Sequence, residues 1–365
     1  MVKPVIFGIS GTRLTDDEIN LFKENEAIGF ILFARNIETK QQLNELTSEL
    51  KSLYPDRETP IFIDQEGGRV ARIKPPIAKS LFPSAEHFAA NYQSNKIKAK
   101  SELKANYIEL MSELKQFGID SPCAPVCDIK FDRASDVIGD RSFGSSPEQV
   151  IDLCRAAIAG ITRCGGIPFI KHIPGHGRAT VDSHYELPIV EEPLETLEET
   201  DFAVFKELAK EKVWGMTAHI IYKALDPDNT ATTSKKVIEY IRNNIGFKGT
   251  LVSDDICMYA LHGEIGKKST ILKRVLELAF QNKQWKEQYA EELKKTFGFN
   301  AYEIGNPIII EQCENKLLEI KPVFLESLAK VTKMTIEAGC DIVLHCSGDL
   351  EEMQAVCREL YSYSI

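Results

Sequence analysis

The chain has 365 residues, of which 43% are hydrophobic and 27% charged, and its formal net charge is -10. This composition supplies a sizeable core and excludes an intrinsically disordered chain. The acidic balance and the absence of a basic stripe argue against nucleic acid or a membrane surface as a partner. Nine cysteines without CxxC pairs, no secretory signal and no apolar run of membrane-spanning length together favour a protein of the cytoplasm.

Short apolar runs rich in Val, Ile and Phe recur along the chain, and each is followed by a polar segment and a helical pattern. Eight such runs predict strands at residues 4–10, 28–34, 59–64, 121–128, 167–172, 213–219, 250–254 and 341–345. Runs such as Ile61-Phe62-Ile63 are continuously apolar, as expected of parallel strands buried on both faces. The pattern predicts one α/β domain over residues 1–365, folded as a single TIM-type (β/α)8 barrel.

Helix start signals lie between the predicted strands. Thr39 precedes the helical pattern of residues 40–53, and Ser146, with Gln149 three residues later, precedes a pattern that ends near residue 165. Similar signals predict helices that begin at about Glu195 and Ser234.

The segment 262–322 departs from this alternation of predicted strands and helices. It is rich in Lys and Glu and helical in pattern, with turn residues at Gly298, Asn300, Gly305 and Pro307. We therefore expect a helical insertion between the seventh and eighth strands, which could serve as an active-site lid, a partner surface or simple packing.

Polar side chains gather where the predicted strands end. An open doubly wound sheet would place them at one switch point and would carry GxGxxG in its first turn, which this chain lacks. One aspartate after a strand is more often a helix cap, and one histidine is more often a core residue, so only the whole group predicts a site. The group comprises Asp64, Glu66, Asp128, Lys171, His172, His176, Asp182, His184, His219, Asp254, Asp255 and His345. After the third strand, Gly67-Gly68 predicts a turn that brings the backbone close to anything bound.

Three runs resemble motifs of glycoside hydrolase family 3. They are IDQEGGRV at residues 63–70, KHIPGHG at 171–177 with Asp182-Ser183-His184 after it, and SDDICM at 253–258. Weaker matches in the family's order are FPSA at 82–85, APVCDI at 124–129, DRSF at 140–143, MTAH at 216–219 and EAGCD at 337–341. The set is most similar to the family's single-domain, NagZ-type β-N-acetylglucosaminidases, since we expect no second α/β domain here.

The resemblance implies retention of anomeric configuration through a covalent glycosyl intermediate. Asp254 matches the nucleophile of the family, and His184, with Asp182 two residues before it, matches the acid/base pair. A histidine with a pKa of about 6.5 can donate and accept a proton at cytoplasmic pH. Asp255 is expected to support the nucleophile rather than to react.

The same resemblance assigns substrate binding to Asp64, Arg72, Arg141, Lys171 and His172. The implied substrate is a small carbohydrate, N-acetylglucosamine β-1,4-linked to 1,6-anhydro-N-acetylmuramic acid, with or without a peptide, cleaved during cell-wall recycling. We expect no metal and no cofactor, and a monomer is favoured. The sequence departs from the family pattern at Cys257, Tyr259 and Arg178 and over the segment 264–322, which affects fine specificity rather than the reaction class.

Two other functions remain open from the residues alone. His172, His176, Asp182 and His184 could instead hold a hydrolytic metal, although the first strand lacks the HxH of a metal-dependent barrel. A sugar-binding barrel that has lost turnover is the second alternative. Chelator treatment would test the first alternative, and release of a free sugar would test the second.

Overall fold

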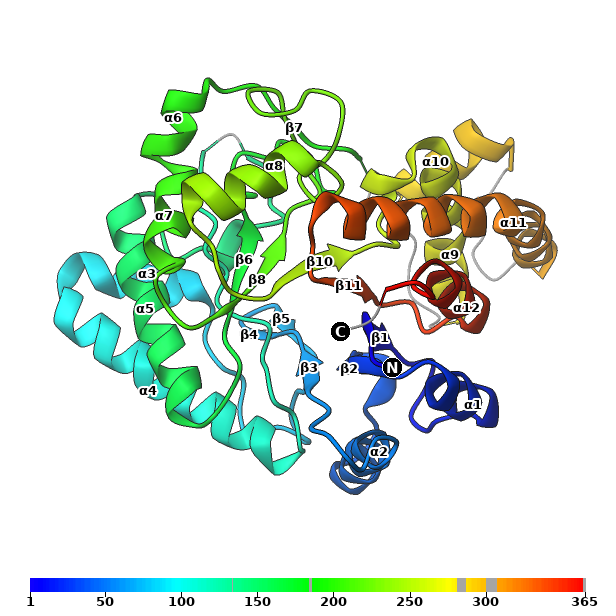
Figure 1. Ribbon diagram of the computed structural model, residues 1–365, viewed down its shortest axis with the longest axis horizontal. Coiled ribbons are helices and arrows are strands. Elements are labelled where there is room, and N and C mark those ends of the chain that lie inside the picture. The colour runs from blue at the N-terminus through cyan, green and yellow to red at the C-terminus, as the bar shows by residue number, and fades with distance from the viewer. Residues whose placement is uncertain (133, 184–185, 281–286, 300–306, 364–365) are drawn as a thin grey trace.

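The computed structural model describes residues 1–365 except 133, 184–185, 281–286, 300–306 and 364–365. Its centre is a seven-stranded parallel sheet with the order β3-β2-β1-β11-β10-β8-β6 (Figure 1). The strands are β1 Lys3–Gly8, β2 Ala27–Leu32, β3 Ile61–Ile63, β6 Phe169–Ile173, β8 Trp214–Thr217, β10 Leu251–Asp255 and β11 Ile342–His345. The predicted α/β class is therefore confirmed, with helices around a parallel sheet.

The fourth predicted strand, residues 121–128, does not form a strand, so this part of the prediction is wrong. Pro122 and Pro125 have no N–H to donate to a neighbouring strand, which prevents a regular ladder. Single parallel bridges nevertheless join the segment to Phe62 of β3 and to Lys171 of β6. An irregular segment thus lies between the two edge strands of the sheet, in place of the fourth strand of the predicted barrel.

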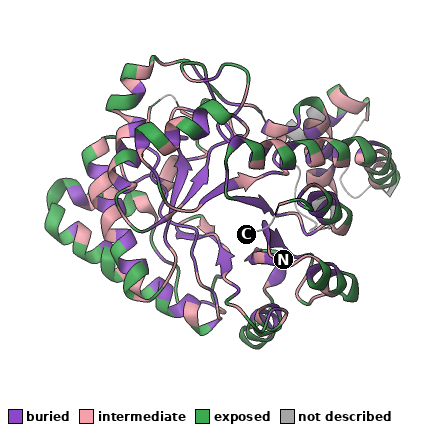
Figure 2. Cartoon of the chain, in the orientation of Figure 1, coloured by how far each residue is buried: buried purple, intermediate pink, exposed green. Residues whose placement is uncertain are grey.

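The sheet is buried on both faces. Along β1, Val5 and Phe7 belong to the large core beneath the helices, whereas Ile6 between them belongs to a second, smaller core. Cys123, from the irregular segment, contributes to this second core. In Figure 2 the strands are purple and the outer faces of the helices are mostly green. Burial of both faces explains why the strands appear in the sequence as continuous apolar runs.

The helices surround the sheet. They are α1 Asp16–Glu24, α2 Lys40–Ser52, α3 Ala85–Ser94, α4 Lys96–Gln116, α5 Pro147–Arg163, α6 Leu194–Glu199, α7 Asp201–Leu208, α8 Lys235–Tyr240 and α12 Leu350–Glu359. Two predicted N-caps are confirmed: the Thr39 hydroxyl accepts from the Gln42 amide at 3.1 Å, and the Ser146 hydroxyl accepts from the Gln149 amide at 3.4 Å. Within the described residues, every helix is too short or too polar to cross a bilayer.

Three helices connect β10 to β11, where the insertion is predicted. They are α9 Gly263–Phe280, α10 Glu287–Phe297 and α11 Pro307–Ala338, and they lie together with α12 at one side of the molecule (Figure 1). Leu272, Leu293 and Cys313, one from each helix, meet in a small core of their own. The helical prediction for this segment is therefore confirmed, whereas its purpose as an insertion stays untested.

The predicted turns and the predicted end of this segment fall around α10 and α11. Gly298 directly follows α10, whereas Asn300 and Gly305 lie outside the described residues. At Pro322, where the end of the insertion is predicted, α11 continues through the proline, so the helix itself marks no boundary there. Two residues after Pro322, Phe324 packs into the large hydrophobic core, and this contact holds α11 against the rest of the protein.

Candidate active site

The carboxyl ends of the strands surround a hollow of about 320 Å³, which falls at the small end of the range for small-molecule sites, about 300–1,000 Å³. Seven of the eight predicted site residues line it: Asp64, Arg72, Arg141, Lys171, His172, Asp182 and Asp254. The eighth, His184, lies outside the described residues. A larger hollow of about 740 Å³ between α3 and α4 contains none of the predicted site residues in its lining. We therefore take the hollow at the strand ends as the candidate site.

Charged side chains form a continuous network of ion pairs along the wall of this hollow. Arg72 Nη2 lies 2.9 Å from Asp64 Oδ2, and Lys171 Nζ lies 3.1 Å from Asp64 Oδ1. Lys171 Nζ also lies 2.7 Å from Glu66 Oε1. Glu66 in turn accepts from Arg141 through both carboxylate oxygens, at 2.8 and 2.9 Å. Two carboxylates thus fix three cations, in a geometry that leaves further donors and acceptors for a bound ligand.

Glu66 belongs to the polar group noted at the strand ends, but sequence reasoning gave it no role in binding or catalysis. A signal existed, because Asp64 and Glu66 are two residues apart and therefore point to the same face of an extended chain. Gln65 between them points the other way, where its amide donates to the Ile73 carbonyl at 2.9 Å. Alternation past the strand end would have predicted that both carboxylates face the hollow.

The ion pairs determine the charge state of these groups. Burial alone would raise the pKa of Asp64, but Lys171 and Arg72 outweigh it and hold that pKa well below its usual value. Burial opposes ionisation of Glu66 as well, yet Arg141 and Lys171 lower its pKa to about 2. Burial would lower the pKa of Lys171, but the two carboxylates raise it. At neutral pH the wall therefore presents fixed charges.

A second polar cluster is centred on Asp128, which sequence reasoning noted at a strand end but did not assign to the site. Its Oδ2 lies 2.7 Å from His172 Nδ1, and its Oδ1 accepts from the backbone amides of His172 and His176, at 3.3 and 2.5 Å. Asp128 thereby fixes the orientation of the His172 ring, with Nε2 as the nitrogen not engaged by this carboxylate.

The loop that carries the predicted acid/base pair is held at Ser183. His176 Nε2 lies 3.3 Å from the Ser183 hydroxyl, and the Ala260 amide donates to the Ser183 carbonyl at 3.3 Å. Since Ala260 follows β10, the loop of Asp182 is tied to the segment after Asp254. Both carboxylates line the same hollow as a result. Among the described residues, His172, His176 and Asp182 take part in no group of three potential metal ligands.

We expect His176→Gln to reduce the loss of stability between pH 6.5 and 4. Burial, together with repulsion from His172, lowers the pKa of His176 from 6.5 to about 4. Within this window the unfolded chain binds one more proton, so the stability present above pH 6.5 decreases by about 3 kcal/mol as pH falls. Urea unfolding at several pH values measures the slope of the free energy of unfolding against pH. The exposed His87→Gln serves as a matched control, and equal slopes for wild type and His176→Gln would contradict the prediction.

The end of β10 presents two aspartates with different surroundings. Both Asp254 and Asp255 line the hollow, but the backbone contacts of Asp255 set it apart. Asp255 Oδ1 accepts from the amides of Cys257 and Cys346, both at 3.1 Å, and the Asp255 carbonyl lies 2.8 Å from His219 Nε2. Asp255 and His219 therefore hold the backbone around Asp254.

The Gly67-Gly68 turn needs glycine for its backbone conformation and for its close packing against another segment of the chain. Both glycines have positive φ, 101° and 59°, which allows the hairpin of β4 Gln65–Gly67 and β5 Val70–Ala71. A Cβ on Gly67 would collide with the carbonyl of Pro83, and one on Gly68 would collide with Ser84. The backbone of the turn therefore closely approaches the segment of Pro83 and Ser84.

A parallel α/β fold whose strand ends present fixed carboxylates, cations and imidazoles to one small hollow can bind a small polar molecule through many directed hydrogen bonds. The Glycosyl hydrolase family 3 N terminal domain matches residues 5–296. The chain belongs to this family and is a glycoside hydrolase, as the resemblance in the sequence predicts.

Individual relatives agree with this family. A β-hexosaminidase of Alkalilimnicola ehrlichii is 37% identical over 263 residues, which cover 71% of this chain and 74% of that protein. One of Pseudomonas aeruginosa is 33% identical over 259 residues, 71% of this chain and 75% of that protein. Among solved structures, NagZ from Neisseria gonorrhoeae in complex with N-trifluoroacetyl-D-glucosamine has a TM-score of 0.74 and 28% identity, over 100% of this chain and 86% of that one.

Proposed function

We propose that the protein is a retaining exo-β-N-acetylglucosaminidase that removes terminal N-acetylglucosamine from 1,6-anhydro-muropeptides during cell-wall recycling. The observation that carries the proposal is that Asp254 and Asp182 line one hollow with the ion-paired wall of Asp64, Lys171 and Arg141. Membership of family 3 and relatives named β-hexosaminidase supply the reaction class and the sugar.

In the proposed mechanism Asp254 attacks the anomeric carbon while His184 donates a proton to the leaving oxygen. The C–O bond to the aglycone breaks, and a glycosyl ester of Asp254 forms. His184 then removes a proton from water, which attacks the same carbon and releases the sugar with retained configuration. Asp182 would hold the imidazole and stabilise its charged form. The attachment of Ser183 to His176 and Ala260 supports this assignment, because it ties the loop to the segment after Asp254.

Binding of the sugar is assigned to Asp64, Arg72, Arg141, Lys171 and His172. Their side chains are held in place by mutual ion pairs and, at His172, by Asp128, so they lose little side-chain freedom when a ligand arrives. Hydroxyl groups can donate to the carboxylates and accept from the cations, which offsets their loss of water.

The proposal extends to the whole chain. Residues 1–365 would act as one (β/α)8-type domain in which the irregular segment 121–128 occupies the position of the fourth strand, and its hydrogen bonds to both edge strands support this view. The enzyme would work as a monomer in the cytoplasm on a small carbohydrate, without a cofactor.

Mass spectrometry of the products from one defined muropeptide tests the proposal. N-acetylglucosamine β-1,4-linked to 1,6-anhydro-N-acetylmuramyl peptide should yield the free sugar and the intact anhydro-muramyl peptide, and reaction in 18O-labelled water should place one label on the sugar. Formation of a sugar phosphate in phosphate buffer would indicate that the enzyme is a phosphorylase, with phosphate rather than water as the acceptor. Binding without release would indicate the sugar-binding alternative, and loss of turnover with a chelator would indicate the metal-dependent one.

A further inference from the structure

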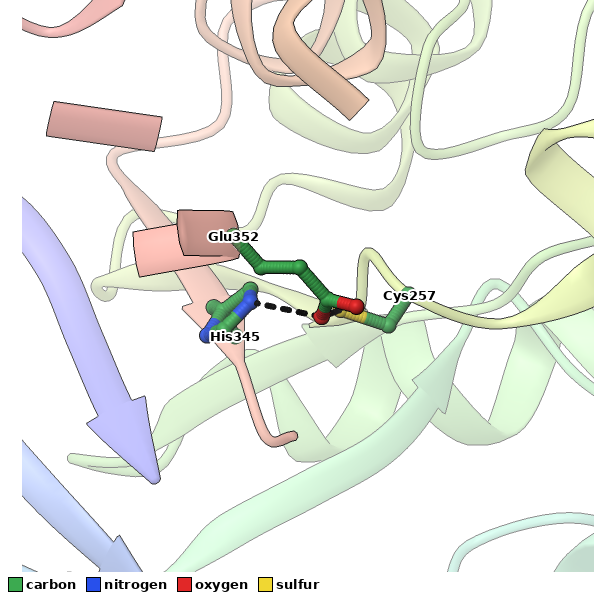
Figure 3. Close-up of side chains that lie close together, drawn as sticks. All are labelled: Cys257, His345 and Glu352. Atoms are coloured by element: carbon green, nitrogen blue, oxygen red, sulfur yellow. Dashed lines mark hydrogen bonds and ion pairs between the residues drawn. The ribbon is translucent and has the colours of Figure 1, made fainter. Parts of the chain in front are cut away.

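Three side chains with metal-binding atoms converge at one point, and each comes from a different part of the fold (Figure 3). Cys257 follows β10, His345 ends β11, and Glu352 lies on α12. Glu352 Oε2 lies 3.5 Å from Cys257 Sγ and 3.3 Å from His345 Nε2. His345 and Glu352 are buried, and Cys257 is half-buried.

We propose that Cys257, His345 and Glu352 form a binding site for one Zn²⁺ ion. A tetrahedral zinc ion has a Zn–S distance of about 2.3 Å and Zn–N and Zn–O distances of about 2.0–2.2 Å, which separates its ligand atoms by about 3.3–3.6 Å. The two separations at Glu352 Oε2, 3.3 and 3.5 Å, fall in this range. Thiolate with imidazole favours zinc over magnesium or calcium, which prefer oxygen ligands. On binding, the thiol proton leaves to solvent.

The surroundings of the three ligands are arranged to support a cation. Lys273 Nζ lies 2.6 Å from Glu352 Oε1, which leaves Oε2 directed at Cys257 and His345. The Ser347 hydroxyl lies 2.6 Å from the same Oε2 and 3.3 Å from His345 Nε2, so it can orient the carboxylate or approach the ion. Among the described residues His345 Nδ1 has no hydrogen-bond partner, so the polar contacts of the ring are on the Nε2 side, which faces the other two ligands.

The charges of the site would balance when it is occupied. The thiolate of Cys257 and the carboxylates of Glu352 and Asp255 carry three negative charges, whereas Zn²⁺ and Lys273 carry three positive ones. Asp255 belongs to this count because its Oδ1 accepts from the Cys257 amide at 3.1 Å. The ion would link the ends of β10 and β11 to α12, directly beside the residue that follows Asp254. Its role would be structural, and it does not depend on the proposed glycosidase activity.

Metal titration of the intact, chelator-treated protein tests this site. We expect one equivalent of Zn²⁺ to bind and to raise the melting temperature, because a ligand that binds only the folded state stabilises it. Co²⁺ in place of Zn²⁺ should produce the near-ultraviolet charge-transfer absorption of a cobalt–thiolate bond. Cys257→Ser should abolish this absorption and weaken binding of Zn²⁺ by more than the roughly 10–100-fold that follows loss of an outer-shell partner.

Cys164→Ser is the matched control, since Cys164 is also half-buried but follows α5, and this variant should bind both metals like the wild type. Absence of the thiolate absorption in the wild type would overturn the proposal. So would Zn²⁺ binding that Cys257→Ser leaves unchanged, which would place the ion on other residues, such as the carboxylates of the hollow. Cys257→Ser leaves the buried Glu352–Lys273 pair intact, so its result can be interpreted even if Glu352→Gln fails to fold.

Discussion

Asp254→Ala is expected to lower kcat/KM for an aryl β-N-acetylglucosaminide by roughly 10³-fold or more, because removal of a nucleophile leaves only the binding and charge-stabilising parts of catalysis. The melting temperature should change little. Asp255 rather than Asp254 accepts the hydrogen bonds from the Cys257 and Cys346 amides that hold this turn. Initial rates over a range of substrate concentrations, together with thermal unfolding, measure both quantities.

Azide distinguishes a lost nucleophile from a general loss of activity. In Asp254→Ala the anion can attack the anomeric carbon directly, so the product should be the α-glycosyl azide. In a His184→Ala variant azide should instead attack the glycosyl ester of Asp254 and give the β-glycosyl azide. Asp254→Ala with near wild-type turnover, or with β-azide as its product, would show that another residue is the nucleophile.

Much of the fold could be predicted because parallel strands buried on both faces appear as continuous apolar runs, such as Ile61-Phe62-Ile63 of β3. The same criterion failed at residues 121–128. That segment is also apolar and also crosses the core, but Pro122 and Pro125 remove the donors that a ladder needs. Apolar periodicity predicts burial, whereas hydrogen-bonding capacity decides whether a buried segment forms a strand.

The location of the site could be predicted for a related reason, since side chains at the carboxyl ends of strands all face one end of the fold. Contacts between them could not be predicted. That Glu66 joins Lys171 to Arg141, and that Cys257, His345 and Glu352 meet, depends on pairings between segments far apart in the sequence. Spacing along one chain carries no information on such distances.

Glu66→Gln is expected to destabilise the protein by about 3–5 kcal/mol, the usual effect of removing one partner from a buried ion pair. Lys171 is 2% exposed and would keep Asp64 as its remaining carboxylate, while Arg141 would lose both charged hydrogen bonds to Glu66. The variant is nearly isosteric, so the effect reports charge rather than packing. Urea unfolding at neutral pH measures this loss of stability, provided that the free energy of unfolding depends on urea concentration with the same slope in wild type and variant.

Glu148→Gln is the matched control, because Lys96 lies 2.7 Å from Glu148, the same distance that separates Lys171 from Glu66. The Glu148 pair is exposed to solvent, so its loss should leave stability unchanged within error. Equal effects of the two substitutions would mean that the wall of the hollow is screened by water like the outer surface. A large effect of Glu66→Gln alone would instead mean that the cations of the proposed sugar site are held in place by a buried carboxylate, and that their positions are fixed before a ligand binds.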